Sequence, residues 1–229
     1  IGWCDWSSDV CSSDLISLID EMPPGRQKVI TSIISEKEKT KAYDFIKSQV
    51  DSGRQAYIVA PLVDESENLD LNSAVEIYKE LSTSHFSGYK LGLLHGKMSN
   101  SEKEEIINKF YRGKINVLIS TTVVEVGVNV PNAVVMLILN AERFGLAQLH
   151  QLRGRVGRGK CQSYCILVNE SKSKKSKDRM NILKRTDNGF IIAEEDLKIR
   201  GPGDFFGVRQ HGLSKLEIQN IVNNVETVQ

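Results

Sequence analysis

Hydrophobic and polar positions alternate in blocks along this chain: short apolar runs rich in β-branched residues are separated by segments with helical spacing. The apolar runs predict six strands, at residues 29–34, 56–60, 90–94, 115–119, 133–139 and 163–168. Several runs are continuously apolar, which is typical of strands buried on both faces. The alternation predicts an α/β fold in which helices cover both faces of a parallel sheet.

Four helices are predicted between these strands, at residues 36–51, 71–82, 100–112 and 146–155. The third is the clearest, because Ser99 and Glu102 form a capping-box pattern and Gly113 supplies a stop. Its inward stripe consists of Ile106, Ile107 and Phe110. The acidic residues 64–70 predict an exposed loop.

The character of the chain changes after residue 168, where a lysine- and serine-rich stretch (169–178) leads to a helical pattern and a glycine-rich segment. We therefore predict one lobe over residues 16–168 and a small helical, loop-bearing extension over 169–229. The lysine run itself indicates a solvated surface. Residues 1–15 are interpreted as non-native, because 9–15 read as the translation of a common sequencing adapter.

Charge and composition argue against a strongly basic nucleic-acid binder, a membrane protein and a zinc protein. Lys and Arg number 30 against 29 Asp and Glu, so any contact with nucleic acid must come from a local cluster. Neither a membrane span nor a signal peptide is indicated, which predicts a cytoplasmic protein. The four cysteines lack zinc-site spacing, so we expect free thiols and no metal site on this chain.

The most specific motif is the arginine cluster in residues 151–158, Gln-Leu-Arg-Gly-Arg-Val-Gly-Arg. Closely spaced guanidinium groups can reach one polyanion together, and the intervening glycines allow backbone and ligand to approach. The general alternative explanation of this cluster is an exposed basic helix end. The spacing Gln-x-x-Gly-Arg-x-Gly-Arg is more specific than such a helix end requires. The overlapping Gly-x-x-x-x-Gly-Lys pattern is rejected as a phosphate-binding P-loop, because Cys161 replaces the required hydroxyl and no strand precedes it.

A second group of candidate residues lies where predicted strands end. The threonine-rich segment 120–131 follows the strand that ends at Ile119, and His95 follows another. Open α/β sheets place ligands at the carboxyl ends of their strands. Taken alone, the first segment is equally well explained as a turn, and a lone histidine as an ordinary polar residue.

The arginine cluster and the segment 120–131 resemble the sixth and fifth motifs of the second large helicase superfamily, whose lobes have a RecA-like fold. Residues 55–61 resemble its fourth motif, and residues 94–98 resemble the segment that faces DNA. The resemblance implies that Arg158 is an arginine finger for ATP and that Arg155 is a second phosphate contact. It also implies nucleotide contacts by Gln151, Gly127 and Asn129, although Asn129 stands where the family has an acidic residue.

The same resemblance implies DNA contacts by Thr121, Thr122 and His95. The glycine-rich segment around Gly-Pro-Gly-Asp-Phe-Phe (201–206) resembles the TRG motif of RecG helicases and of transcription-repair coupling factors. Arg200, Arg209 and Gln210 would then relay lobe movement to duplex DNA. Pro202 and the Arg209-Gln210 pair favour the RecG family.

No P-loop and no acidic box that could bind Mg²⁺ occur in this sequence. The RecG resemblance therefore implies that ATP and Mg²⁺ are held mainly by an N-terminal lobe, and that this chain alone is inactive. The implied partners are branched DNA, such as forks and Holliday junctions, together with that lobe and a wedge domain, in a monomer without membrane contact. Two alternatives stay open: a fragment of a coupling factor and a non-catalytic DNA-binding module.

Overall fold

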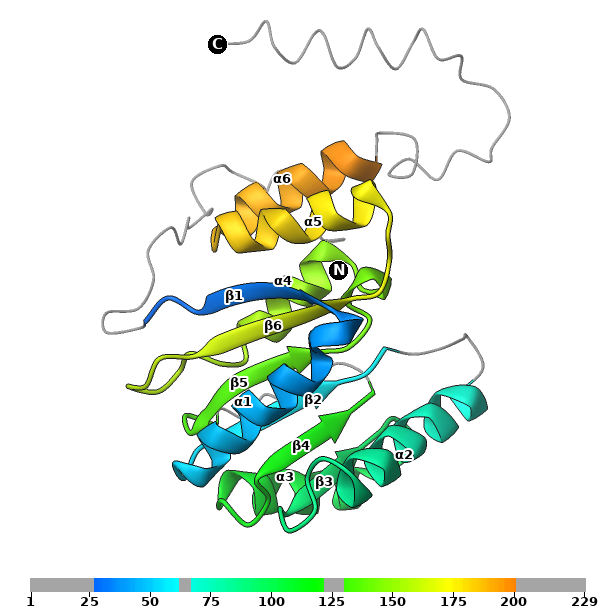
Figure 1. The fold of residues 1–229 in the computed structure, drawn as a ribbon, viewed down its shortest axis with the longest axis vertical. Helices are drawn as coiled ribbons and strands as arrows, with labels where there is room; N and C mark the ends of the chain where they lie inside the picture. The colour runs from blue at the N-terminus through cyan, green and yellow to red at the C-terminus, as the bar shows by residue number, and fades with distance from the viewer. Residues whose placement is uncertain (1–26, 62–66, 122–129, 201–229) are drawn as a thin grey trace, which may run out of the picture.

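The computed structural model describes residues 27–61, 67–121 and 130–200, and there it contains one six-stranded parallel sheet of order β1-β6-β5-β2-β4-β3 (Figure 1). The strands are β1 (Ile30–Ser35), β2 (Gln55–Val59), β3 (Leu91–Leu94), β4 (Val117–Ser120), β5 (Ala133–Ile138) and β6 (Tyr164–Asn169). Every residue of β2, β4 and β5 is buried. The predicted parallel sheet, with continuously apolar central strands, is confirmed.

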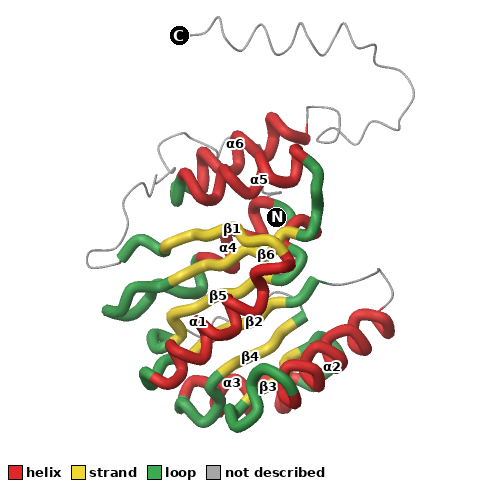
Figure 2. Tube along the Cα trace, viewed as in Figure 1, coloured by secondary structure: helices red, strands yellow, loops and turns green. Residues whose placement is uncertain are grey.

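The helices follow the strands in the predicted order (Figure 2). They are α1 (Lys39–Asp51), α2 (Glu67–Thr83), α3 (Asn100–Tyr111), α4 (Leu146–Arg153), α5 (Lys174–Arg185) and α6 (Gly189–Arg200), with short 3-10 turns at Glu36–Glu38 (η2) and Ala141–Arg143 (η3). The loop prediction for 64–70 is wrong from Glu67 onward. Acidic residues suit the first turn of a helix because their negative charge interacts favourably with the positive end of the helix dipole. A polar, acidic composition there therefore does not exclude a helix.

The predicted capping of α3 is present. The Ser99 hydroxyl accepts a hydrogen bond from the Glu102 amide at 3.3 Å, and the Glu102 carboxylate accepts one from the Ser99 amide at 2.8 Å. Gly113 follows the helix with φ of +71°, a conformation that costs glycine little. Ile107 and Phe110 are buried and Ile106 is partly buried, so the predicted stripe faces the core.

Helices cover the sheet on both faces. Residues of α1 and α2 share one apolar cluster with the sheet, and residues of α3 and α4 share the other. Helices α5 and α6 extend the second layer past β1, at the edge of the sheet (Figure 1). Met180, Leu183 and Ile192 join the same core cluster as α4, so these two helices pack directly on the lobe. The domain boundary near residue 169 stays a prediction.

In the part of the chain that the structure describes, no helix is both long and apolar enough to span a membrane.

Candidate nucleotide and DNA interface

The arginine segment lies at the amino-terminal edge of the sheet. Because α4 returns antiparallel to the strands, its last residues and the loop to β6 reach the starts of β1, β5 and β6. A Cβ atom on Gly157 would lie 2.7 Å from Val29, and one on Gly159 would lie 2.4 Å from the Pro131 carbonyl oxygen. These two glycines therefore let the loop pack closely against the residues before β1 and β5, whereas the sequence suggested that Gly157 leaves room for a ligand.

Arg155 and Arg158 remain available for an anion. Arg158 is exposed, and its Nε donates to the Gly154 carbonyl oxygen at 3.2 Å, while Arg155 is partly buried. Neither forms an ion pair with any residue that the structure describes. Burial raises the pKa of the Tyr57 hydroxyl to about 12, and both arginines oppose that rise, so their charges act near the same point of β2. Gln151 is exposed one turn earlier, on α4.

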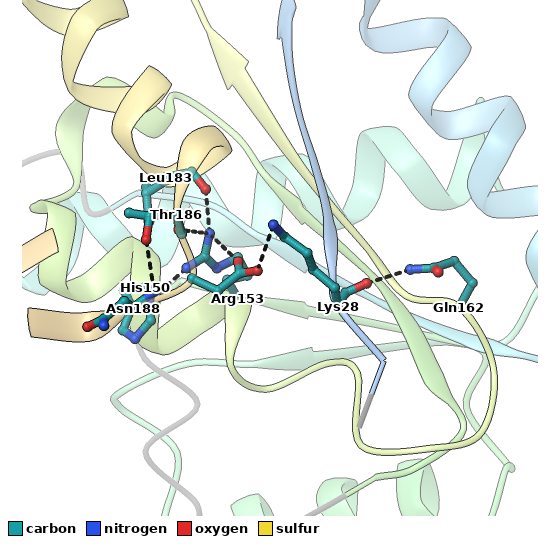
Figure 3. Close-up of polar contacts among 8 residues, drawn as sticks. Lys28, His150, Arg153, Gln162, Leu183, Thr186 and Asn188 are labelled. Atoms are coloured by element: carbon teal, nitrogen blue, oxygen red, sulfur yellow. Dashed lines mark hydrogen bonds and ion pairs between the residues drawn. The ribbon is translucent and has the colours of Figure 1, made fainter. Parts of the chain in front are cut away.

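Arg153, the third arginine of the cluster, has a different environment that the sequence did not reveal. It is 3% exposed, and its guanidinium group forms an ion pair with Asp187 at 3.1 Å (Figure 3). It also donates to the carbonyl oxygens of Leu183 and Thr186 and contacts His150 Nδ1 at 2.9 Å. Arg153 therefore joins α4 to the turn between α5 and α6.

The same turn reaches the residues that precede β1. Lys28 Nζ lies 3.5 Å from the other carboxylate oxygen of Asp187, and the Lys28 side chain is 70% exposed (Figure 3). A Cβ atom on Gly189, the first residue of α6, would lie 3.3 Å from His150 Nε2. Residues 28, 150–153 and 186–189, far apart in the sequence, thus form one contact region beside the arginine segment.

The predicted DNA contacts lie at the opposite, carboxyl-terminal edge. Leu94 of β3 is in register with Ser120 of β4, so His95 and Thr121 follow at the ends of neighbouring strands. The amide of Thr121 donates to the Leu94 carbonyl oxygen at 3.4 Å, and Thr121 is buried. The structure brings these two residues together and separates them from the arginines.

The other predicted site residues cannot be placed. Thr122, Gly127, Asn129, Arg209 and Gln210 lie outside the described residues. Arg200 is the last residue of α6, and its side chain also lies outside the description. Their roles stay predictions.

His95 carries a neutral imidazole at neutral pH. Burial lowers the pKa of His95, Glu102 opposes this effect, and Lys103 and Lys97 add to it. Its Nδ1 is buried without a hydrogen-bond partner among the described residues. Lys103 is held nearby, because its Nζ donates to the Gly96 carbonyl oxygen at 2.9 Å.

The lowered pKa of His95 predicts a stability change with pH. The unfolded chain takes up a proton at this residue near pH 6.5, whereas the folded chain resists it, so stability is lost as pH falls through that region. We expect His95→Gln to reduce the loss of unfolding free energy between about pH 7.5 and about pH 5.5. Urea denaturation at both pH values measures this, and an unchanged loss would contradict the assignment.

The remaining titratable groups supply no obvious metal centre. Among the described residues, no three His, Cys, Asp or Glu side chains gather as a possible metal site. Cys161 and Cys165 are free thiols, and burial raises the pKa of Cys165 to about 12. The guanidinium groups of Arg155 and Arg158, which form no ion pair within the described residues, are suited chemically to an anionic ligand.

Comparison with known proteins assigns the family. Residues 37–160, more than half of the chain, match the family described as helicase conserved C-terminal domain. The chain belongs to this family. Residues 186–229 match the C-terminal part of domain 3 of the ATP-dependent DNA helicase RecG.

Individual relatives confirm the resemblance to RecG. The chain is 49% identical to the RecG helicase of Synechocystis over 213 residues, and 49% identical to that of Streptococcus pneumoniae over 210 residues. These alignments cover 93% and 91% of this chain, but only 26% and 31% of the two relatives. The chain therefore spans less than a third of the length of these proteins.

Solved structures confirm the RecA-like fold of the helicase lobe. A structure of RecG bound to a three-way DNA junction matches with a TM-score of 0.71 and 45% identity, covering 90% of this chain and 26% of that one. Domain 2 of the DEAD-box helicase Mss116p, bound to an RNA duplex, matches with a TM-score of 0.54 at 19% identity, covering 74% of this chain and 68% of that one. The second likeness concerns the fold alone.

Proposed function

We propose that this chain is the C-terminal motor portion of an ATP-dependent DNA helicase that acts on branched DNA at replication forks and Holliday junctions. The observation that carries the proposal is the contrast within one arginine cluster. Arg153 is buried in an ion pair, whereas Arg155 and Arg158 have no carboxylate partner among the described residues. Two cations left without a counter-charge at a domain edge suit a ligand supplied by another part of the protein.

The ATP chemistry follows from that arrangement. In the complete helicase, ATP and Mg²⁺ are held mainly by the N-terminal lobe, because this sequence has no P-loop. Arg158 acts as the finger that stabilises negative charge on the transferred phosphoryl group, and Arg155 is the second phosphate contact. Gln151, Gly127 and Asn129 contribute the further nucleotide contacts.

DNA is held at the other edge of the sheet. Thr121, Thr122 and His95 contact the phosphate backbone, and a neutral His95 does so as a hydrogen-bonding group without charge. Beyond α6, Arg209 and Gln210, with Arg200 at the end of that helix, relay the movement of the lobe to the duplex. The contact region around Arg153 couples α6 to α4, which leads into the arginine segment.

The RecG-specific match over residues 186–229 favours this proposal over a transcription-repair coupling factor. The same proposal places the protein in the bacterial cytoplasm as a monomer, with the N-terminal lobe and the wedge domain of the same polypeptide as its intramolecular partners. Junction recognition is assigned to the wedge domain.

Reconstitution tests the proposed function. We expect the 229-residue chain to hydrolyse no ATP with or without branched DNA, whereas the complete helicase that carries it hydrolyses ATP when a three-way junction is added. A coupled assay of phosphate release measures both. Hydrolysis by the isolated chain, or a complete protein that DNA does not stimulate, would contradict the proposal.

A further inference from the structure

A basic hollow lies at the carboxyl-terminal edge of the sheet, beside α5. It has a volume of about 540 Å³ and is formed by the ends of β1 and β6 and by α5. The lysine-rich stretch 169–178, which the sequence indicated as a plain solvated surface, forms part of its wall. Carboxyl ends of parallel strands are where open α/β sheets bind ligands.

Four lysines from three segments converge on this hollow. Lys37 comes from the 3-10 turn after β1, Lys172 from the connection between β6 and α5, and Lys177 and Lys184 from α5. The last two are seven residues apart and therefore share one face of the helix. Solvation of one helix face would explain the lysines of α5 alone. It does not explain why lysines from two other segments line the same hollow.

These lysines have no ion-pair partner in the part of the chain that the structure describes. None of the four forms an ion pair or a side-chain hydrogen bond there. Each of them is exposed, so their ammonium groups can reach a ligand.

The two carboxylates of the hollow do not neutralise it. Glu36 is engaged with Lys39, whose Nζ lies 2.5 Å from its carboxylate oxygen. Burial raises the pKa of Glu170, and the neighbouring Glu36 raises it further. Four cations thus face two carboxylates, one of which is already paired with Lys39, so the hollow carries a net positive charge.

The wall of the hollow is held in place by its own hydrogen bonds. The Asn169 side-chain oxygen accepts from the Ser171 amide at 3.0 Å and from the Ser176 hydroxyl at 3.4 Å. These bonds fix the turn from β6 into α5. Lys172 is therefore carried on an ordered connection.

We propose that this hollow, with Lys37, Lys172, Lys177 and Lys184, is a second phosphate-binding site that takes the backbone of duplex DNA. It lies on the same edge of the sheet as His95 and Thr121, and on the edge opposite Arg155 and Arg158. Five strand spacings of about 4.8 Å separate β1 from β3, so both contacts together span about 24 Å. That length corresponds to about seven phosphates along one strand.

That the ligand is DNA rests on the proposed function. The binding experiment that tests the site does not depend on ATP hydrolysis. Fluorescence anisotropy of a labelled duplex, titrated with the 229-residue chain between about 50 and about 200 mM salt, gives the slope of log affinity against log salt. We expect Lys177→Ala with Lys184→Ala to reduce that slope by about 1.8, because each lost phosphate contact removes about 0.9. A single-stranded oligonucleotide should show a smaller reduction, about 0.7 for each contact.

A matched control removes the same charge elsewhere. Lys90 and Lys114 are exposed lysines that precede β3 and β4, at the opposite edge of the sheet. Lys90→Ala with Lys114→Ala should leave the slope unchanged. Equal reductions by both double variants would overturn the site, since they would reflect net charge alone.

A gain-of-binding variant guards against misfolding as an explanation. Glu170→Gln removes a carboxylate from the hollow and should tighten duplex binding about twofold, as expected for one charge at about 8 Å in water. An unchanged slope in the lysine variant, no gain from Glu170→Gln, or a wild-type chain that does not bind duplex at about 50 mM salt would each overturn the site. None of these outcomes decides whether the complete helicase hydrolyses ATP.

Discussion

Replacing Arg158 with alanine in the complete helicase is expected to lower the kcat of DNA-stimulated ATP hydrolysis at least about 10³-fold, the usual contribution of an arginine finger. The folded lobe should tolerate the change. Arg158 is exposed and makes one described side-chain hydrogen bond, to the Gly154 carbonyl oxygen, so the unfolding free energy should change by no more than about 0.5 kcal/mol. Steady-state hydrolysis with a saturating three-way junction measures the first effect, and urea denaturation measures the second.

Lys160 provides a matched control in the same loop. It is exposed, two residues from Arg158, and it is the lysine of the P-loop-like pattern. We expect Lys160→Ala to retain nearly normal turnover, because no described strand leads into that loop as a P-loop requires. Equal losses in both variants would support a phosphate-binding loop, and normal turnover in Arg158→Ala would refute the finger.

The fold was predictable because its signals are local. Most strands are apolar runs, and each predicted strand boundary lies within two residues of the observed one. The start of α2 was missed because acidic residues favour both exposed loops and helix N-termini. Composition alone cannot separate these two environments.

The sequence suggests candidate site residues, whose roles stay predictions, but it does not report their arrangement. The motifs pointed to Arg155, Arg158, Thr121 and His95, but not to the arginines lying at one edge of the sheet and the other two at the opposite edge. That separation arises because α4 returns antiparallel to β5 and carries the arginine segment to the amino ends of the strands. Sequence spacing does not report which edge a segment reaches.

Two features depend on contacts between distant residues and had no signal in the sequence. Arg153 looked like a third exposed arginine, yet its partner Asp187 lies 34 residues away in the chain. Lys172 and Lys177 lie in the charge run that indicated a solvated surface, and only the pairing of β1 with β6 brings Lys37 to them. Such pairings are set by tertiary packing.

Unlike the exposed Arg158, the buried Arg153 is expected to contribute strongly to the stability of the chain. Arg153→Met should lower the unfolding free energy of the chain by about 3 kcal/mol, because removing one partner of a buried ion pair leaves the other poorly compensated. The carbonyl oxygens of Leu183 and Thr186 would also lose their donor. Urea denaturation of the 229-residue chain, without ATP or DNA, measures this loss.

Lys28→Ala is the control, because it removes the other cation that contacts Asp187. The Lys28 side chain is 70% exposed and lies 3.5 Å from the carboxylate, so its loss should cost less than about 1 kcal/mol. If Arg153→Met costs no more than Lys28→Ala, the ion pair does not hold α4 to the turn between α5 and α6. In the complete helicase, coupling of hydrolysis to DNA movement through that turn would then lose its physical basis, whereas the finger assignment of Arg158 would stand.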